Sequence, residues 1–161
     1  MKYVGGKHRI GEKIEEVLSK VPPNMVNGYI EPFVGSLGVF KHMADKPYKI
    51  KIGSDKHSSL ILLWKGIQSK TFTPPKRISE TLFVRLKSTK DTEPSALKAL
   101  IGFGASFGGD YFSGYIQKYA GSSGRDFYKE TLTSIEKMKP VIRSGNVKFY
   151  NKSYTYWKTK K

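Results

Sequence analysis

The sequence predicts an α/β domain built on a partial, doubly wound parallel sheet with a helical insertion. Three observations support this fold class. Short strand patterns alternate with amphipathic helices over residues 1–70, helical patterns occupy 71–140, and a further strand pattern lies within 141–161. Strands that alternate with helices favour parallel pairing, because each crossover helix returns the chain to the same end of the sheet. These ranges are the three expected parts of the chain, and the basic tail from Trp157 onwards is expected to be loose.

The first part should begin with a helix and a short strand. Residues 9–20 place apolar side chains at helical spacing along one stripe, which consists of Ile10, Ile14, Val17 and Leu18. Pro22 and Pro23 should end this helix, because proline cannot continue the backbone hydrogen bonds. Residues 27–33 then have the composition of a short buried strand.

A glycine turn and a second strand should follow. The turn covers 35–38 and leads into a helix from about Val39. Residues 48–53 alternate like a strand, with Asp55 just past the strand's end. Residues 58–68 are expected to form the next amphipathic helix, because leucine, isoleucine and tryptophan recur there at helical spacing.

The insertion should consist of helices. We expect two of them near 78–87 and 93–103, and a third over about 124–138 that ends before Pro140. A third strand, 147–150, follows and should complete a sheet of three parallel strands.

The charge of the chain indicates its partner more than its fold. There are 29 Lys and Arg residues against 13 Asp and Glu residues, a formal net charge of +16. Nucleic acid is the polyanion that such a protein attracts most readily, because binding releases counterions from the phosphates. A merely soluble basic protein is the alternative. An anionic membrane surface is less favoured, since no helix pairs a basic face with a bulky aromatic one.

Several classes of protein are excluded by composition. The sequence has no cysteine, which excludes a disulfide scaffold, a cysteine zinc site and a thiol nucleophile. Its three histidines are scattered, so no metal site is expected. No apolar run is long enough for a transmembrane helix, and the N-terminus has no apolar signal-peptide core.

Three segments could carry chemistry. The turn at 35–38 lies between a strand and a helix, where glycine lets a ligand approach the backbone, and Asp55 follows Gly35 by 20 residues, at the spacing of an acid that accepts bonds from ribose hydroxyls. The pattern matches neither a dinucleotide fingerprint nor a P-loop. A glycine kept only for packing is the alternative.

The other two segments are the loop Tyr3-Val4-Gly5-Gly6-Lys7 and the stretch 103–115. The loop offers one cation that suits a carboxylate or phosphate, or else it is a frayed terminus. The stretch interleaves glycine with aromatic residues, which suits stacking platforms for nucleic acid, a packed loop whose rings belong to the core, or both together.

Taken together, these segments resemble a known family. Y-x-G-G-K near the N-terminus, E-P-F-x-G at the first strand and an acid after the second strand resemble the DNA adenine-N6 methyltransferases of the alpha class, the Dam-like family. S-F-G-G-x-Y-F-x-G-Y, and later V-K-F-Y-N-x-x-Y, are similar to its phage-borne and mobile-element branch. The resemblance implies a methyltransferase sheet, S-adenosylmethionine as cofactor, duplex DNA as substrate and a restriction-modification setting. It also implies a cytoplasmic location in a bacterial or virus-infected host cell.

The resemblance also implies site residues. Those matching the family's cofactor motifs are Tyr3, Lys7, Glu31, Pro32, Phe33, Gly35 and Asp55. Those matching the strand-three motif beside the cofactor's adenine ring are Phe149, Tyr150 and Tyr154. The residues expected to contact DNA are Lys7, Tyr111, Tyr115, Lys118, Tyr119 and Arg125. The family commonly has a second glycine where this chain has Leu37, so the shape of the turn should differ here.

One expected motif is absent. The family's catalytic D-P-P-Y does not occur in the sequence, so no catalytic residue is assigned. The chain therefore resembles the family's N-terminal half. Three interpretations follow: an enzyme of this family, one subunit of a split enzyme, or a non-catalytic remnant that binds DNA or cofactor. In each of them the first strand, around Tyr29, should be an open edge that favours self-association or a second subunit.

Overall fold

The structure is a computed structural model that describes residues 1–116 and 124–158. Its sheet has three parallel strands in the order β1-β2-β3, as the sequence predicts. The elements, in chain order, are α1 (Gly11–Leu18), the 3-10 turn η1 (Pro23–Met25), β1 (Tyr29–Glu31), α2 (Phe40–Met43), β2 (Lys51–Asp55), α3 (Ser58–Gln68), α4 (Glu80–Ser88), α5 (Ala96–Gly104), the 3-10 turn η2 (Phe107–Gly109), α6 (Phe127–Ile142), β3 (Val147–Asn151) and α7 (Tyr154–Lys158).

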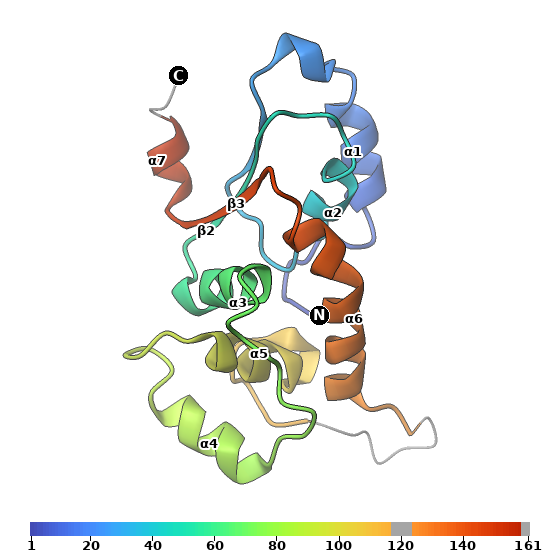
Figure 1. Ribbon diagram of the computed structural model, residues 1–161. Helices are drawn as coiled ribbons and strands as arrows, with labels where there is room; N and C mark the ends of the chain where they lie inside the picture. The colour runs from blue at the N-terminus through green and yellow to red at the C-terminus, as the bar shows by residue number, and fades with distance from the viewer. Residues whose placement is uncertain (117–123, 159–161) are drawn as a thin grey trace.

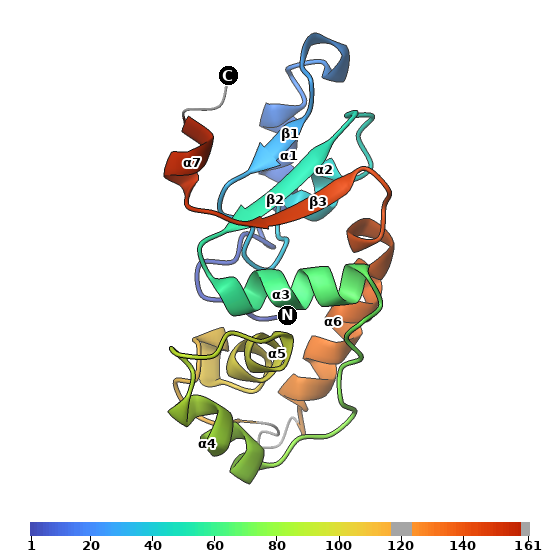
Figure 2. The same ribbon diagram turned by 60° about the vertical axis from the view of Figure 1, so that its left-hand side comes forward.

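The helices between β2 and β3 in the chain continue the stack that begins with the sheet. Helix α3 packs against β2 and β3, α5 packs on α3, and α4 lies against α5, so that the sheet is at one end of the molecule and α4 at the other (Figure 2). Helix α6 runs alongside this stack and returns the chain from the α5 end to β3 (Figures 1 and 2).

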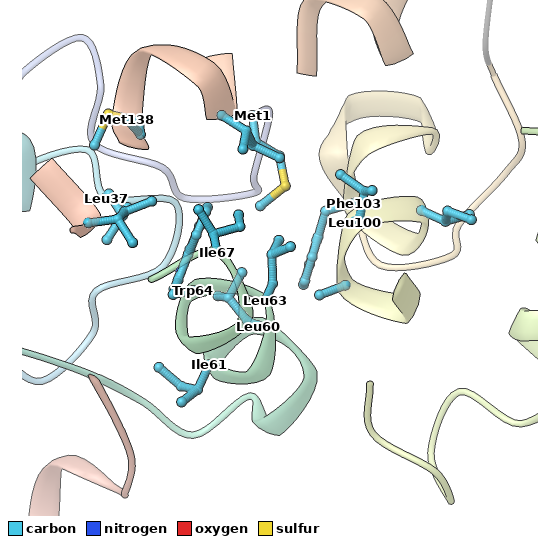
Figure 3. Close-up of a cluster of buried hydrophobic side chains, with 14 of the residues drawn as sticks. Met1, Leu37, Leu60, Ile61, Leu63, Trp64, Ile67, Leu100, Phe103 and Met138 are labelled. Carbon is cyan, nitrogen blue, oxygen red and sulfur yellow. The ribbon is translucent and has the colours of Figure 1, made fainter. Parts of the chain in front are cut away.

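One hydrophobic core joins the sheet to helices α3, α4, α5 and α6. Figure 3 shows the side chains of α3 at its centre, with Leu60 and Leu63 directed toward Leu100 and Phe103 of α5. Leu37, from the glycine turn, lies on the other side beside Trp64. Because these side chains belong to one buried cluster, the turn rests on the same core as helix α5.

The first strand is not buried as its composition suggests. Side chains of β1 are only partly covered, and Ile30 is 41% exposed. The prediction of a buried strand was wrong because β1 pairs with β2 alone within the described residues, which makes it an edge strand, as the prediction of an open edge required. Helix α1 is also exposed on its apolar stripe, and Val17 is 61% exposed there.

Two other expectations were wrong at the C-terminal end. Helix α6 does not end before Pro140 but continues through it to Ile142, which is fully buried. A proline near the end of a helix removes one backbone donor, and the burial of Ile142 offsets that loss. The tail is not loose at Trp157, because α7 forms there. Residues 159–161 lie outside the described residues.

Candidate functional site

The carboxyl ends of β1 and β2 border a cleft of about 370 Å³. This volume lies in the range of small-molecule sites. Three segments far apart in the sequence form it: the N-terminal loop, the end of β1 with its turn, and the end of β2. The lining residues are Tyr3, Gly5, Gly6, Lys7, Glu31, Pro32, Phe33, Val34, Gly35, Ser36, Gly38 and Asp55. All seven residues assigned by resemblance to a cofactor therefore lie around one cleft.

The turn after β1 has left-handed backbone at two positions. Gly35 has a φ of +45°, and Leu37 has a φ of +66°. Leucine in this region costs about 1–2 kcal/mol. Burial of Leu37, which is not exposed at all, offsets that cost. The turn is also held by α3, because the indole Nε1 of Trp64 donates a hydrogen bond of 3.0 Å to the carbonyl of Gly35.

Asp55 is the last residue of β2 and joins the turn to α3. Its Oδ2 accepts the backbone N–H of Gly35 at 3.0 Å, and its Oδ1 accepts the backbone N–H of His57 at 2.9 Å. Each oxygen keeps a further acceptor position. The carboxylate, which is 9% exposed, is therefore fixed in orientation at the floor of the cleft.

Glu31 supplies the second acid of the cleft. Its Oε2 accepts the hydroxyl of Tyr29 at 2.9 Å. Burial, with a smaller effect from the charge of Asp55, raises the pKa of Glu31 to about 7. Burial and the charge of Asp55 also raise the pKa of Tyr3 to about 12. A cation bound in the cleft would relieve this crowding of negative charge and favour the ionised form of Glu31.

The N-terminal loop approaches the turn so closely that only glycine fits. A Cβ on Gly38 would lie 2.8 Å from the backbone nitrogen of His8 and 2.9 Å from that of Lys7. Tyr3 lies over Gly35, whose Cβ would be 3.1 Å from the ring, and a hydrogen bond of 3.0 Å joins His8 Nε2 to the hydroxyl of Ser36. The two glycine segments predicted separately from sequence thus form one unit.

Comparison with known families gives one match, and it includes this unit. The family model for D12 class N6 adenine-specific DNA methyltransferases matches residues 3–99, which include the N-terminal loop, the turn and Asp55. The chain belongs to that family. No curated protein matches this chain. D12 methyltransferases generally use S-adenosylmethionine, which combines a sulfonium and an ammonium with a carboxylate, and the residues of the cleft fit such a group: two acids face it together with one lysine.

Three residues that the sequence did not assign individually lie in or beside the site. Ser36 and Gly38 line the cleft, and both belong to the turn 35–38 that the sequence singled out as a candidate. His57 caps the N-terminus of α3 by accepting the N–H of Leu60. Its ring also packs against that of Tyr111, with centroids 4.4 Å apart, which ties the end of β2 to the segment after η2. No sequence pattern indicated this contact.

The strand-three residues separate in the structure. Phe149 is buried in the core and packs against Phe40, with ring centroids 5.8 Å apart. It therefore does not line the cleft. Tyr154, in α7, packs against Phe33 at the rim of the cleft, with centroids 5.3 Å apart. The ring of Tyr150 lies 5.7 Å from that of Trp157.

The residues expected to contact DNA are only partly described. Tyr111 and Tyr115 are half-buried, and both pack against rings of the core, as the packed-loop interpretation of 103–115 requires. Arg125 forms a two-pronged salt bridge with Glu130, with both nitrogen–oxygen distances 2.8 Å. Lys118 and Tyr119 lie outside the described residues.

A wider groove of about 1010 Å³ lies between α1, α2 and α6, and its lining mixes acids with lysines. It contains none of the family motifs. Within residues 1–116 and 124–158, no three histidine, aspartate or glutamate side chains gather as metal ligands would. None of the helices in these ranges is both long and apolar enough to span a membrane.

Proposed function

We propose that the cleft binds S-adenosylmethionine and that the chain serves adenine-N6 methylation of duplex DNA. The observation that carries the proposal is the convergence of the N-terminal loop, the glycine turn and Asp55 on one cleft within a chain of the D12 family. When bound, the cofactor would supply an activated methyl group. The insertion, with the glycine- and aromatic-rich stretch, is proposed to recognise the DNA.

The residues of the cleft suit the parts of this cofactor. Asp55 is proposed to accept ribose hydroxyls, since its carboxylate is fixed by two backbone N–H groups and keeps free acceptor positions. Glu31 faces the positive charge of the cofactor, and Lys7 its carboxylate. Tyr3 and Phe33 provide the apolar walls.

A non-catalytic binding module is the second candidate. It is favoured by the absence of D-P-P-Y, because adenine's amine is a poor nucleophile and needs the acceptors of that motif. A split enzyme shares this feature, and the open edge of β1 would then receive a second subunit or a second copy of the chain. A methyl-transfer assay on adenine-containing duplex DNA, run beside light scattering, separates these proposals from an enzyme that acts alone.

Calorimetry with S-adenosylmethionine tests the cofactor site. We expect binding that Asp55→Ala weakens at least about tenfold, because hydrogen bonds to a charged group contribute about 1.5–3 kcal/mol. Asp55→Asn should have a smaller effect, since the amide oxygen still accepts one backbone N–H. Asp45→Ala, an exposed acid outside the cleft, is the matched control. No heat at millimolar cofactor would contradict the proposal.

Cofactor affinity should rise with pH through the titration of Glu31. The pKa of Glu31 is raised to about 7, so its carboxyl is largely protonated at pH 6 and ionised at pH 8, where it attracts a cation better. Because the pKa is raised on folding, the same group favours the folded state below its unfolded value near 4.5, and this stabilisation is lost as pH rises to about 7. Calorimetry across this range should show a flatter dependence for Glu31→Gln. An equal dependence in that variant would rule out this role of Glu31.

DNA binding should depend steeply on salt. Each phosphate neutralised contributes about −0.9 to the slope of log affinity against log salt concentration. Arg125→Gln should flatten this slope by roughly one unit if Arg125 leaves Glu130 for a phosphate. Glu130→Gln, which frees Arg125 from its salt bridge, should strengthen binding. Fluorescence anisotropy of a labelled duplex measures both, and affinity that does not change with salt would favour the merely basic protein.

A further inference from the structure

Two aromatic rings lie exposed at the rim of the cofactor cleft. Phe33, just after β1, is 69% exposed, and Tyr154, at the start of α7, is 42% exposed. Their centroids are 5.3 Å apart and their planes differ by 30°. Tyr154 is the only described residue whose ring contacts that of Phe33, so much of the phenylalanine ring is open to a further stacking partner.

Three exposed lysines lie on the same side of the sheet as this pair. Lys158 lies with its ammonium 5.0 Å from the ring centroid of Tyr154. Lys56 and Lys152 follow the ends of β2 and β3, and these ends are tied together, because the Asn151 amide donates to the carbonyls of Asp55 and Lys56 at 2.9 Å each. The three lysines therefore belong to the same carboxyl edge of the sheet as Phe33.

The acids of this edge do not neutralise the lysines at the surface. Glu31 is held by the hydroxyl of Tyr29, and Asp55 by two backbone N–H groups, and both line the cleft. The outer face of the rim, as far as the structure describes it, thus presents aromatic rings with positive charge. This combination is what unpaired nucleotides require, since bases stack on rings and phosphates pair with lysine.

We propose that Phe33, supported by Tyr154, stacks on an unpaired nucleobase of the DNA strand, while Lys56, Lys152 and Lys158 contact its flanking phosphates. The inference rests on DNA as the substrate of the proposed function and names the surface that takes the unstacked nucleotide. Phe33 also lines the cofactor cleft, so a base on its ring would be held next to that cleft.

A short single-stranded oligodeoxynucleotide with 2-aminopurine in place of one adenine tests the proposal. The fluorescence of this base is quenched by stacking, and anisotropy of an end label reports affinity. Without cofactor and at low salt, we expect quenching by the unaltered protein. Phe33→Leu, which keeps the apolar side chain but removes the ring, should abolish the quenching and weaken binding about tenfold.

Phe33→Trp should keep both signals, because it restores a ring at the same position. Lys152→Gln combined with Lys158→Gln should instead flatten the salt dependence and leave the quenching in place. Phe107, which is 71% exposed in η2, is the competing platform. If the quenching is lost in Phe107→Leu and kept in Phe33→Leu, the proposal is wrong.

Two further outcomes separate this proposal from others. Light scattering that shows a dimer broken by Phe33→Leu, with unchanged oligonucleotide binding, would mean that a second copy covers the patch and would overturn the inference. Calorimetry with S-adenosylmethionine reports on the proposed function independently. If the unaltered protein gives no heat with S-adenosylmethionine but shows quenching that depends on Phe33, the proposed function is wrong and the nucleotide surface is supported. If it binds the cofactor but shows no such quenching, the nucleotide surface is wrong and the proposed function stands.

Discussion

Replacing Trp64 by alanine should lower the free energy of unfolding by about 3–5 kcal/mol, the usual range for a large aromatic truncated in a core. The side chain is 1% exposed and projects from α3 toward the glycine turn. Figure 3 shows it beside Leu37, which belongs to that turn. Its removal leaves a cavity and leaves the carbonyl of Gly35 without its hydrogen-bond donor. Urea denaturation followed by circular dichroism measures the loss.

Two other variants separate packing from the hydrogen bond. Trp64→Phe keeps much of the apolar contact but leaves the Gly35 carbonyl without its indole donor, which should cost about 1–3 kcal/mol. Leu62→Ala removes an exposed side chain from the same helix and should change stability by less than about 0.5 kcal/mol. If Trp64→Phe were as stable as the unaltered protein, the indole bond would not be what holds the turn.

Replacing Gly38 by alanine should weaken S-adenosylmethionine binding strongly while the rest of the fold persists. The new methyl group would meet only backbone atoms of Lys7 and His8, at 2.8–2.9 Å, and backbone cannot rotate away as a side chain can. Either the N-terminal loop or the turn must shift, and overpacking of this kind costs about 1–3 kcal/mol. An equal loss in binding free energy would lower affinity about fivefold to a hundredfold.

Gly145→Ala is the matched control for this change. Gly145 lies before β3, has no atom near its would-be Cβ and has no left-handed φ. Its replacement should leave both cofactor binding and thermal stability unchanged. Calorimetry and thermal unfolding of the two variants decide the matter, and equal cofactor affinity in both would show that the loop and the turn do not need their close contact.

Much of the fold could be predicted because local patterns are strong where burial is high. Helix α3 has the predicted bounds, because the leucine, isoleucine and tryptophan residues of its buried face recur at the spacing of an α-helix. The parallel order of the strands followed from their alternation with helices. Pro140 misled the prediction for α6, because the penalty of a proline is local whereas the burial of Ile142 comes from the core.

The candidate site shows the same division. The spacing of Gly35 and Asp55 predicted that both lie at the carboxyl edge, and the structure joins them by a hydrogen bond of 3.0 Å. The contact of His57 with Tyr111 could not be predicted, because it depends on how the insertion returns to the sheet. Phe149 matched a family motif but is buried in the core, since alternate residues of a strand face opposite sides.

The sequence by itself determined the family, the βα turn with its acid, and a positive charge that suits DNA. These depend on residue types at fixed spacings, which a chain carries before it folds. Only the tertiary structure decided that the loop at Gly6 and the turn at Gly38 close on each other and that Phe33 is exposed at the rim of the cleft. Each of these depends on which distant segments pack against a residue, and packing between distant segments leaves no local periodicity in the sequence.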